Sequence, residues 1–233
     1  MSNVSLFIGS IAPLPDSGRP TGMFKHPVGG ALDLGDQGFA GDEQADLRVH
    51  GGPDKAVHLY PAVHYGRLAH AFPEAASQLG PGSLGENISS ATLDESLVRI
   101  GDVFRLGAAL LQVCQPRNPC WKIDARFGVD GMAAFIAEHH LTGWYFRVLL
   151  PGLVVPGDAL DLVEPGDEGL NLAQAQQLWR QHRPAPLALR QLAATPGIAE
   201  GWRRKIVERA DWLEKHAPRP SPPPAFHVKR ERN

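Results

Sequence analysis

The sequence predicts a mainly β protein that ends in a small three-helix unit. Up to about residue 165, short apolar runs alternate with glycine and proline, which is typical of strands joined by tight turns. Beyond that point, apolar residues recur at the spacing of amphipathic helices. The 233 residues include 25 glycines and 21 prolines, and this abundance of turn-forming residues also favours many short strands.

Short strands are expected throughout the first part of the chain. The Gly-Asp pairs at 101–102 and 157–158 each precede an alternating run, and several neighbouring runs are close enough to form antiparallel hairpins. The expected strands are residues 4–11, 31–34, 56–60, 98–100, 103–106, 109–114, 144–149 and 159–163.

Two helices are expected between these strands. The first begins at Pro61, since proline is well suited to the first helical position, and the second covers about residues 131–140. In the last part of the chain, Asn171 can cap a helix through its side chain. Two more helices are expected at residues 187–194 and 198–216.

These patterns divide the chain into three parts. Residues 1–165 form the β-rich domain and residues 166–216 form the three-helix unit. Because so short a helical unit is not expected to be stable alone, we expect it to pack against the strands. Residues 217–233 are rich in proline and then basic, and we expect them to be disordered.

Composition excludes several classes of function. The formal net charge of −2 offers no electrostatic footprint for duplex nucleic acid or for an anionic membrane. No apolar run approaches the roughly 18 residues of a membrane span, and the first residues lack the basic region and cleavage site of a signal peptide. Two cysteines cannot form a disulfide framework, so we expect a soluble protein of the reducing cytoplasm.

Cys120 is the main candidate for chemistry, because it lies between rigid and basic residues in the stretch QPRNPCWKID. Pro116 and Pro119 fix two φ angles and remove two amide donors, so this loop is stiff. Arg117 and Lys122 favour the thiolate, which is the form that attacks or binds a metal. A buried cysteine that only fills space is the alternative, since free cysteines are commonly buried.

Two further stretches carry weaker signals. In HGGPDK, His50 and Lys55 flank a tight turn where backbone amides and the lysine can hold a phosphate or another anion. The histidines of this region fit no common zinc spacing. In LGEN, Asn87 can be either a turn residue or a binding residue. Cys114 ends an alternating run and is expected to pack within a strand.

Four stretches, in their order along the chain, resemble MOSC domains (molybdenum cofactor sulfurase C-terminal domains). They are FKHPV at 24–28, HGGPDKA at 50–56, LGENI at 84–88 and QPRNPCWK at 115–122. The resemblance covers about residues 20 to 215, and its most specific part is QPRxPC joined to HGGxDKA. The chain is particularly similar to YiiM-like proteins, which also carry a small C-terminal three-helix unit. A MOSC-type β-barrel with a few short helices is therefore implied.

The resemblance implies a bound molybdenum cofactor whose metal takes a thiolate from Cys120. Molybdenum in this cofactor already has two dithiolene sulfurs, and a soft thiolate is a suitable third sulfur ligand. Cys114 departs from the family pattern, since a hydroxyl residue is common at its position. The other motif positions suit the pterin, its phosphate or the shape of the pocket, and they are Lys25, His50, Lys55, Asn87 and Arg117.

The implied activity is the reduction of small N-hydroxylated compounds, such as hydroxylaminopurine bases, to amines. The chain has neither a four-cysteine iron–sulfur pattern nor a flavin fingerprint, so a separate flavin reductase is the expected electron donor. Two other functions stay open. One is a sulfur carrier in which Cys120 forms a persulfide for metal–sulfur cluster or cofactor assembly, and the other is a non-enzymatic carrier of the molybdenum cofactor.

Overall fold

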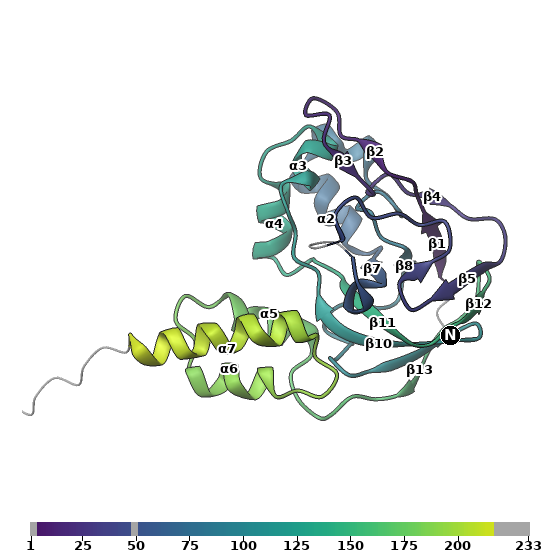
Figure 1. The fold of residues 1–233 in the computed structure, drawn as a ribbon. Helices are drawn as coiled ribbons and strands as arrows, with labels where there is room; N and C mark the ends of the chain where they lie inside the picture. Colours follow the sequence, from purple (N-terminus) through teal and green to yellow (C-terminus); the bar gives the residue numbers. More distant parts are fainter. Residues whose placement is uncertain (1–3, 48–50, 217–233) are drawn as a thin grey trace, which may run out of the picture.

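The computed structural model describes residues 4–47 and 51–216, and its central feature is a mixed eight-stranded sheet. The sheet curls into a half-barrel (Figure 1), and its strand order is β13-β9-β10-β11-β7-β8-β1-β4. Neighbouring strands are antiparallel except β7 and β8, which are parallel. The strands are β1 (Ser5–Ile8), β4 (His26–Pro27), β7 (Val57–Pro61), β8 (Ile88–Ser90), β9 (Val103–Leu106), β10 (Ala109–Pro116), β11 (Trp144–Leu150) and β13 (Leu160–Glu164).

Two small sheets extend the strand-rich part. One contains β12 (Gly152–Val154), β5 (Leu32–Gly35) and β6 (Gly38–Phe39), in that order. The other is the hairpin of β2 (Ala12–Pro13) and β3 (Pro20–Thr21). This hairpin leads directly into the segment that carries Lys25, which makes it the first element that positions the site described below.

Three short helices pack together around a second apolar core. They are α2 (His64–Ala71), α3 (Lys122–Phe127) and α4 (Met132–Glu138), and Figure 1 shows them on one side of the half-barrel. Each helix contributes buried apolar side chains to this core, for example Leu68, Ile123 and Ile136. Two 3₁₀ helices, η1 (Pro53–Lys55) and η2 (Pro73–Gln78), complete the connections of this part.

The C-terminal unit contains α5 (Leu172–Arg180), α6 (Pro186–Ala193) and α7 (Glu200–Lys215). Asn171 caps α5 in a capping box, because its side chain accepts from the Gln174 amide while the Gln174 side chain accepts from the Asn171 amide. The unit shares one apolar core with the sheet, since Ile206 of α7 belongs to the same cluster as Leu111 of β10. The expected packing of the helices against the strands is therefore confirmed.

The structure confirms the mainly β fold with a three-helix unit, corrects two local predictions and adds one helix. Residues 98–100 are not a strand, because Arg99 forms only an isolated bridge and its amide donates to the turn residue Asp102. Pro61 ends β7, and α2 begins only at His64. The helix α3 was not predicted from the sequence. The predicted disordered tail, residues 217–233, lies outside the described residues.

Within the part of the chain that the structure describes, no helix combines the length and the apolar character that crossing a membrane requires. Apolar side chains of the central sheet lie inside the fold. Val57, Leu59 and Tyr60 of β7, for example, are each fully buried. These side chains belong to the two apolar cores of the fold.

Candidate cofactor-binding pocket

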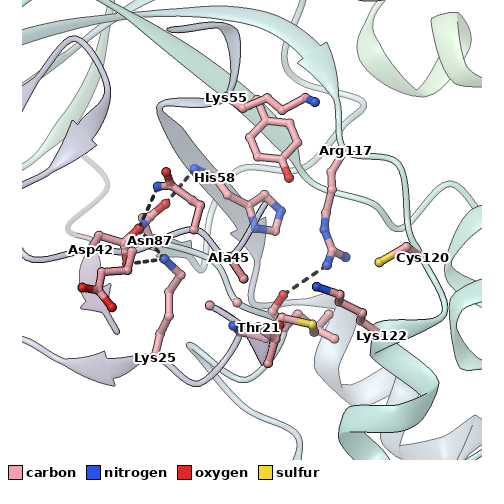
Figure 2. Close-up of a pocket in the computed structure, with 17 residues that line it drawn as sticks. Thr21, Lys25, Asp42, Ala45, Lys55, His58, Asn87, Arg117, Cys120 and Lys122 are labelled. Carbon is pink, nitrogen blue, oxygen red and sulfur yellow. Dashed lines mark hydrogen bonds and ion pairs between the residues drawn. The ribbon is translucent and has the colours of Figure 1, made fainter. Parts of the chain in front are cut away.

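A cavity of about 80 Å³ lies where the loop after β10 meets β7, the 82–87 turn and two N-terminal segments (Figure 2). Its lining includes one cysteine and several cationic side chains from segments that are distant in the sequence. The cavity is lined by five of the predicted site residues, which are Lys25, Lys55, Asn87, Arg117 and Cys120. His50 lies outside the described residues.

Cys120 is placed by the start of α3. Its carbonyl oxygen accepts from the Ile123 amide at 3.0 Å, which begins the helix directly after the cysteine. The residue is half-buried, and Figure 2 shows its sulfur on the side of Arg117 and Lys122. The Lys122 ammonium donates to the Pro20 carbonyl at 2.9 Å, which ties this segment to the end of the β2–β3 hairpin. A partly accessible thiol at a cationic pocket is a suitable metal ligand or nucleophile.

Arg117 is buried, and it has no carboxylate partner among the described residues. Its exposed fraction is 8%, and its guanidinium donates to the Leu84 carbonyl at 3.3 Å and also forms a hydrogen bond with the Tyr145 side chain. The nitrogen Nη1 is buried and has no hydrogen-bond partner in the described part of the chain. A buried charge without a counter-ion is unfavourable. The pocket therefore favours the entry of an anionic group.

Glu86 gives the Leu84 carbonyl its fixed position. The carboxylate is fully buried and accepts from the amides of Gly82 and Leu84, at 2.6 Å and 3.1 Å, and from the Tyr65 hydroxyl. Burial raises the pKa of this carboxyl, and the hydrogen bonds act against that shift. Glu86 thus closes the 82–86 turn, so its role in this site is to position the carbonyl that Arg117 contacts.

Lys25 and Asn87 meet at Asp42, a residue that the sequence analysis did not single out. The Lys25 ammonium and the Asp42 carboxylate form a buried ion pair, with 2.6 Å between Nζ and Oδ2. The Asn87 side-chain amide donates to the same carboxylate oxygen at 2.9 Å. Burial lowers the pKa of Lys25, whereas Asp42 favours the charged ammonium. No spacing rule could have found Asp42, since it lies 17 residues from Lys25 and 45 from Asn87.

His58 was also missed as a pocket residue. It lies in β7, its side chain lines the pocket, and its Nε2 has no hydrogen-bond partner within the described residues. Burial and then the positive charge of Arg117 lower its pKa well below the usual value, so the imidazole is neutral. The available signal was a single polar residue within an apolar strand, because polar residues at such positions are seldom buried without a role.

Lys55 ends the 3₁₀ helix η1 and is half-buried at the wall of the pocket. Burial and the neighbouring charge of Lys205 lower its pKa. The Lys55 ammonium thus lies within electrostatic range of a second cation, Lys205 of α7. Such a pair is compatible with a bound anion.

Cys114 has a packing role. It is fully buried in β10, and its thiol donates to the Asp54 carbonyl at 3.1 Å. Burial raises the pKa of this thiol, so it stays protonated. The expectation that Cys114 packs within a strand is confirmed, and the two cysteines have different environments.

Comparisons with known proteins agree with this fold and with the motifs. Residues 46–161 match the MOSC domain. The chain is 39% identical to YflK of Bacillus subtilis (strain 168) over 215 residues, which is 91% of this chain and 96% of that protein. It is 37% identical to YiiM of Escherichia coli (strain K12), covering 88% of this chain and 91% of that protein. The chain therefore belongs to the MOSC domain family.

Solved structures place it more narrowly. The crystal structure of YiiM from Escherichia coli matches with a TM-score of 0.77 and 30% identity, covering 91% of this chain and 92% of that one. YiiM from Geobacillus stearothermophilus matches with a TM-score of 0.74 and 29% identity, covering 88% and 97%. Because these matches include nearly the whole of both chains, this is a YiiM-like member of the family.

Proposed function

We propose that this protein binds a molybdenum cofactor through Cys120 and reduces N-hydroxylated compounds to amines. The single observation that carries the proposal is the pocket itself. It combines a half-buried cysteine with the buried guanidinium of Arg117, which has no carboxylate partner among the described residues. A thiolate ligand and an anion-binding cation in one cavity suit a cofactor that contains both a metal and a phosphate.

The donor set also supports a metal that brings most of its own ligands. In residues 4–47 and 51–216, no three His, Cys, Asp or Glu side chains are grouped so that they could hold a metal ion. A metal in this pocket would thus rely on Cys120 and on ligands from outside the protein. The dithiolene sulfurs of the pterin would provide them.

In the proposed site, each residue has a separate task. Cys120 binds the metal, and Arg117, Lys25 and Lys55 hold the phosphate and balance its charge. His58 contributes a neutral ring to the wall, beside Tyr145 at 5.2 Å between ring centroids. The bound cofactor supplies two-electron chemistry that removes the hydroxyl oxygen. Two electrons and two protons convert the N-hydroxyl group to an amine and water.

The electrons must come from a partner. The chain has only two cysteines, so it cannot bind a four-cysteine iron–sulfur cluster, and it has no flavin fingerprint. We therefore propose a separate flavin reductase as the donor. The name of one relative also supports reduction: a protein called "Reductase" from Gibberella moniliformis (strain M3125 / FGSC 7600) is 33% identical over 143 residues, covering 61% of this chain and 25% of that protein.

A second candidate function, the Cys120 persulfide carrier, is favoured by the partial exposure of this thiol. The two functions differ in what they require, since a carrier needs neither molybdenum nor an electron donor. Reduction is the stronger proposal, because the phosphate of the cofactor would supply the anionic partner that the buried Arg117 lacks among the described residues.

The test is turnover. Protein purified from a host that makes the cofactor is supplied with a flavin reductase, a reduced nicotinamide and a hydroxylaminopurine base, and formation of the aminopurine is followed by chromatography. The wild type and Cys114→Ser should form the amine, whereas Cys120→Ser should not. Equal turnover by Cys120→Ser would refute the assignment of Cys120, and a wild type that carries a persulfide but forms no amine would favour the carrier.

A further inference from the structure

Asp42 is the centre of the wall of the pocket that carries Lys25. Its side chain is only 1% exposed, and both carboxylate oxygens are in use. Oδ1 accepts from the Gly9 amide at 3.0 Å and from Lys25, and Oδ2 accepts from Lys25 at 2.6 Å and from Asn87 at 2.9 Å. One carboxylate therefore joins the end of β1, the 23–25 segment and the 86–87 turn.

The close approach of these segments depends on glycine. A Cβ atom at Gly9 would lie 2.2 Å from the Phe24 carbonyl oxygen, so only glycine lets the backbone before Lys25 lie against the end of β1. Asp42 then fixes the lysine side chain in this position. The direction of the ammonium is thus determined by the protein before any ligand binds.

The hydrogen-bond donors of Asn87 and Lys25 determine which of these two side chains can bind a ligand. Both amide hydrogens of Asn87 are used, because Nδ2 donates to Asp42 and to the Phe7 carbonyl at 3.3 Å. Its Oδ1 accepts from the His58 amide at 3.1 Å. The Lys25 ammonium has three hydrogens, and its hydrogen bonds within the described residues all go to Asp42. Lys25 lines the cavity, so its third hydrogen is the one available there.

We propose that Asp42 is a positioning residue that directs the Lys25 ammonium at an anionic group of the ligand, while Asn87 supports this arrangement without contacting the ligand. The inference deepens the proposed function and rests on it for the identity of the anion. The chemistry it requires is general, because any phosphate-bearing ligand in this cavity would meet the same ammonium.

Asp42 offers a test in which two effects have opposite signs. If its carboxylate acted only as a negative charge near the cavity, Asp42→Asn would remove a repulsion and tighten the binding of an anion. If it positions Lys25, the same change releases the ammonium or lets it lose its proton in the buried site, and anion binding weakens. The direction of the change in affinity therefore separates the two roles.

The experiment is a calorimetric titration of the protein, without cofactor, with inorganic phosphate. Wild type should show saturable binding, and Asp42→Asn should bind about tenfold more weakly, the effect of losing one charge-assisted hydrogen bond. In a Lys25→Met background, Asp42→Asn should cause no further loss, since Asp42 acts through Lys25. Unchanged or tighter binding by Asp42→Asn, or an equal loss in the Lys25→Met background, would overturn the proposal.

Asp102→Asn is the matched control for loss of a buried carboxylate. Asp102 is 2% exposed and accepts from the amides of Arg99 and Gly166, both at 2.7 Å, but it does not line the cavity. Its variant should lower thermal stability and leave phosphate affinity unchanged. An equal loss of affinity in Asp102→Asn, or no saturable binding by wild type, would also overturn the proposal. Because the titration needs neither molybdenum nor substrate, it is independent of whether the proposed reduction is correct.

Discussion

Replacing Arg117 by methionine should stabilise the ligand-free protein while weakening its binding of anions. Arg117 is 8% exposed, its guanidinium forms no ion pair with a carboxylate of the described residues, and Nη1 has no hydrogen-bond partner among them. A buried charge in this state has an effective penalty of several kcal/mol. The change also removes the long hydrogen bond to Leu84, at 3.3 Å, and the hydrogen bond with the Tyr145 side chain, which together contribute about 1–2 kcal/mol.

The balance of these two effects is a gain of about 1–3 kcal/mol in the free energy of unfolding of the ligand-free protein. The assay is urea unfolding of wild type and Arg117→Met, each prepared without cofactor, together with the phosphate titration described above. Methionine keeps most of the apolar contact of the arginine side chain, so the comparison reports mainly the charge.

Arg147→Met is the matched control, because Arg147 does have a carboxylate partner. Its guanidinium pairs with Asp54 at 2.7 Å and also donates to Gln112 at 3.2 Å. This variant should lose about 1 kcal/mol of stability, since the pair is partly exposed to solvent. If Arg117→Met is destabilised as much as Arg147→Met, the guanidinium is already satisfied without a ligand, and the electrostatic account of the pocket is wrong.

Two further predictions concern protonation and reactivity. The pKa of His58 is lower in the folded protein than in the unfolded chain. As the pH falls, the unfolded state therefore binds the proton first. The stability that depends on neutral His58 is present above about pH 6.5 and is lost below it. His58→Phe should therefore lose less stability than wild type between pH 6.5 and pH 5, by up to about 1.4 kcal/mol per pH unit in urea unfolding. Parallel slopes of the free energy of unfolding against pH for the two proteins would show that the histidine is not buried and neutral. In the folded protein, iodoacetamide should label Cys120 and leave Cys114 unmodified until denaturant is added, because burial raises the pKa of Cys114 and excludes the reagent. Mass spectrometry of the peptides measures the labelling of each cysteine. Labelling of Cys114 before denaturant is added would contradict its packing role.

Much of the fold could be predicted from local patterns. The strands β9, β10 and β11 follow runs whose alternation and turn residues are visible in the sequence, and the cap at Asn171 forms as predicted. Where the predicted secondary structure was wrong or incomplete, the cause is local. Residues 98–100 have strand-like composition, but the Asp102 side chain takes the Arg99 amide that a strand would use. The helix α3 has only six residues, too few for a periodic pattern to be recognised.

The candidate site was predictable to a different extent. One cavity is lined by motif positions that are far apart in the sequence, among them Lys25, Lys55 and Cys120. Their roles as binding residues stay predictions. Asp42 could not be found from spacing, since its contacts with Lys25 and Asn87 depend on how three loops meet in the folded chain. Tertiary contacts of this kind have no local signal in the sequence.

Metal and pterin content tests the central claim most directly. Wild type, Cys120→Ser and Cys114→Ser would be purified from a host that makes the cofactor, and molybdenum and pterin would be measured per chain after the fold of each variant is verified by circular dichroism. The account predicts that wild type and Cys114→Ser hold molybdenum at about one atom per chain and that Cys120→Ser does not retain it. A well-folded wild type without molybdenum, or a Cys120→Ser variant with the wild-type amount, would contradict it.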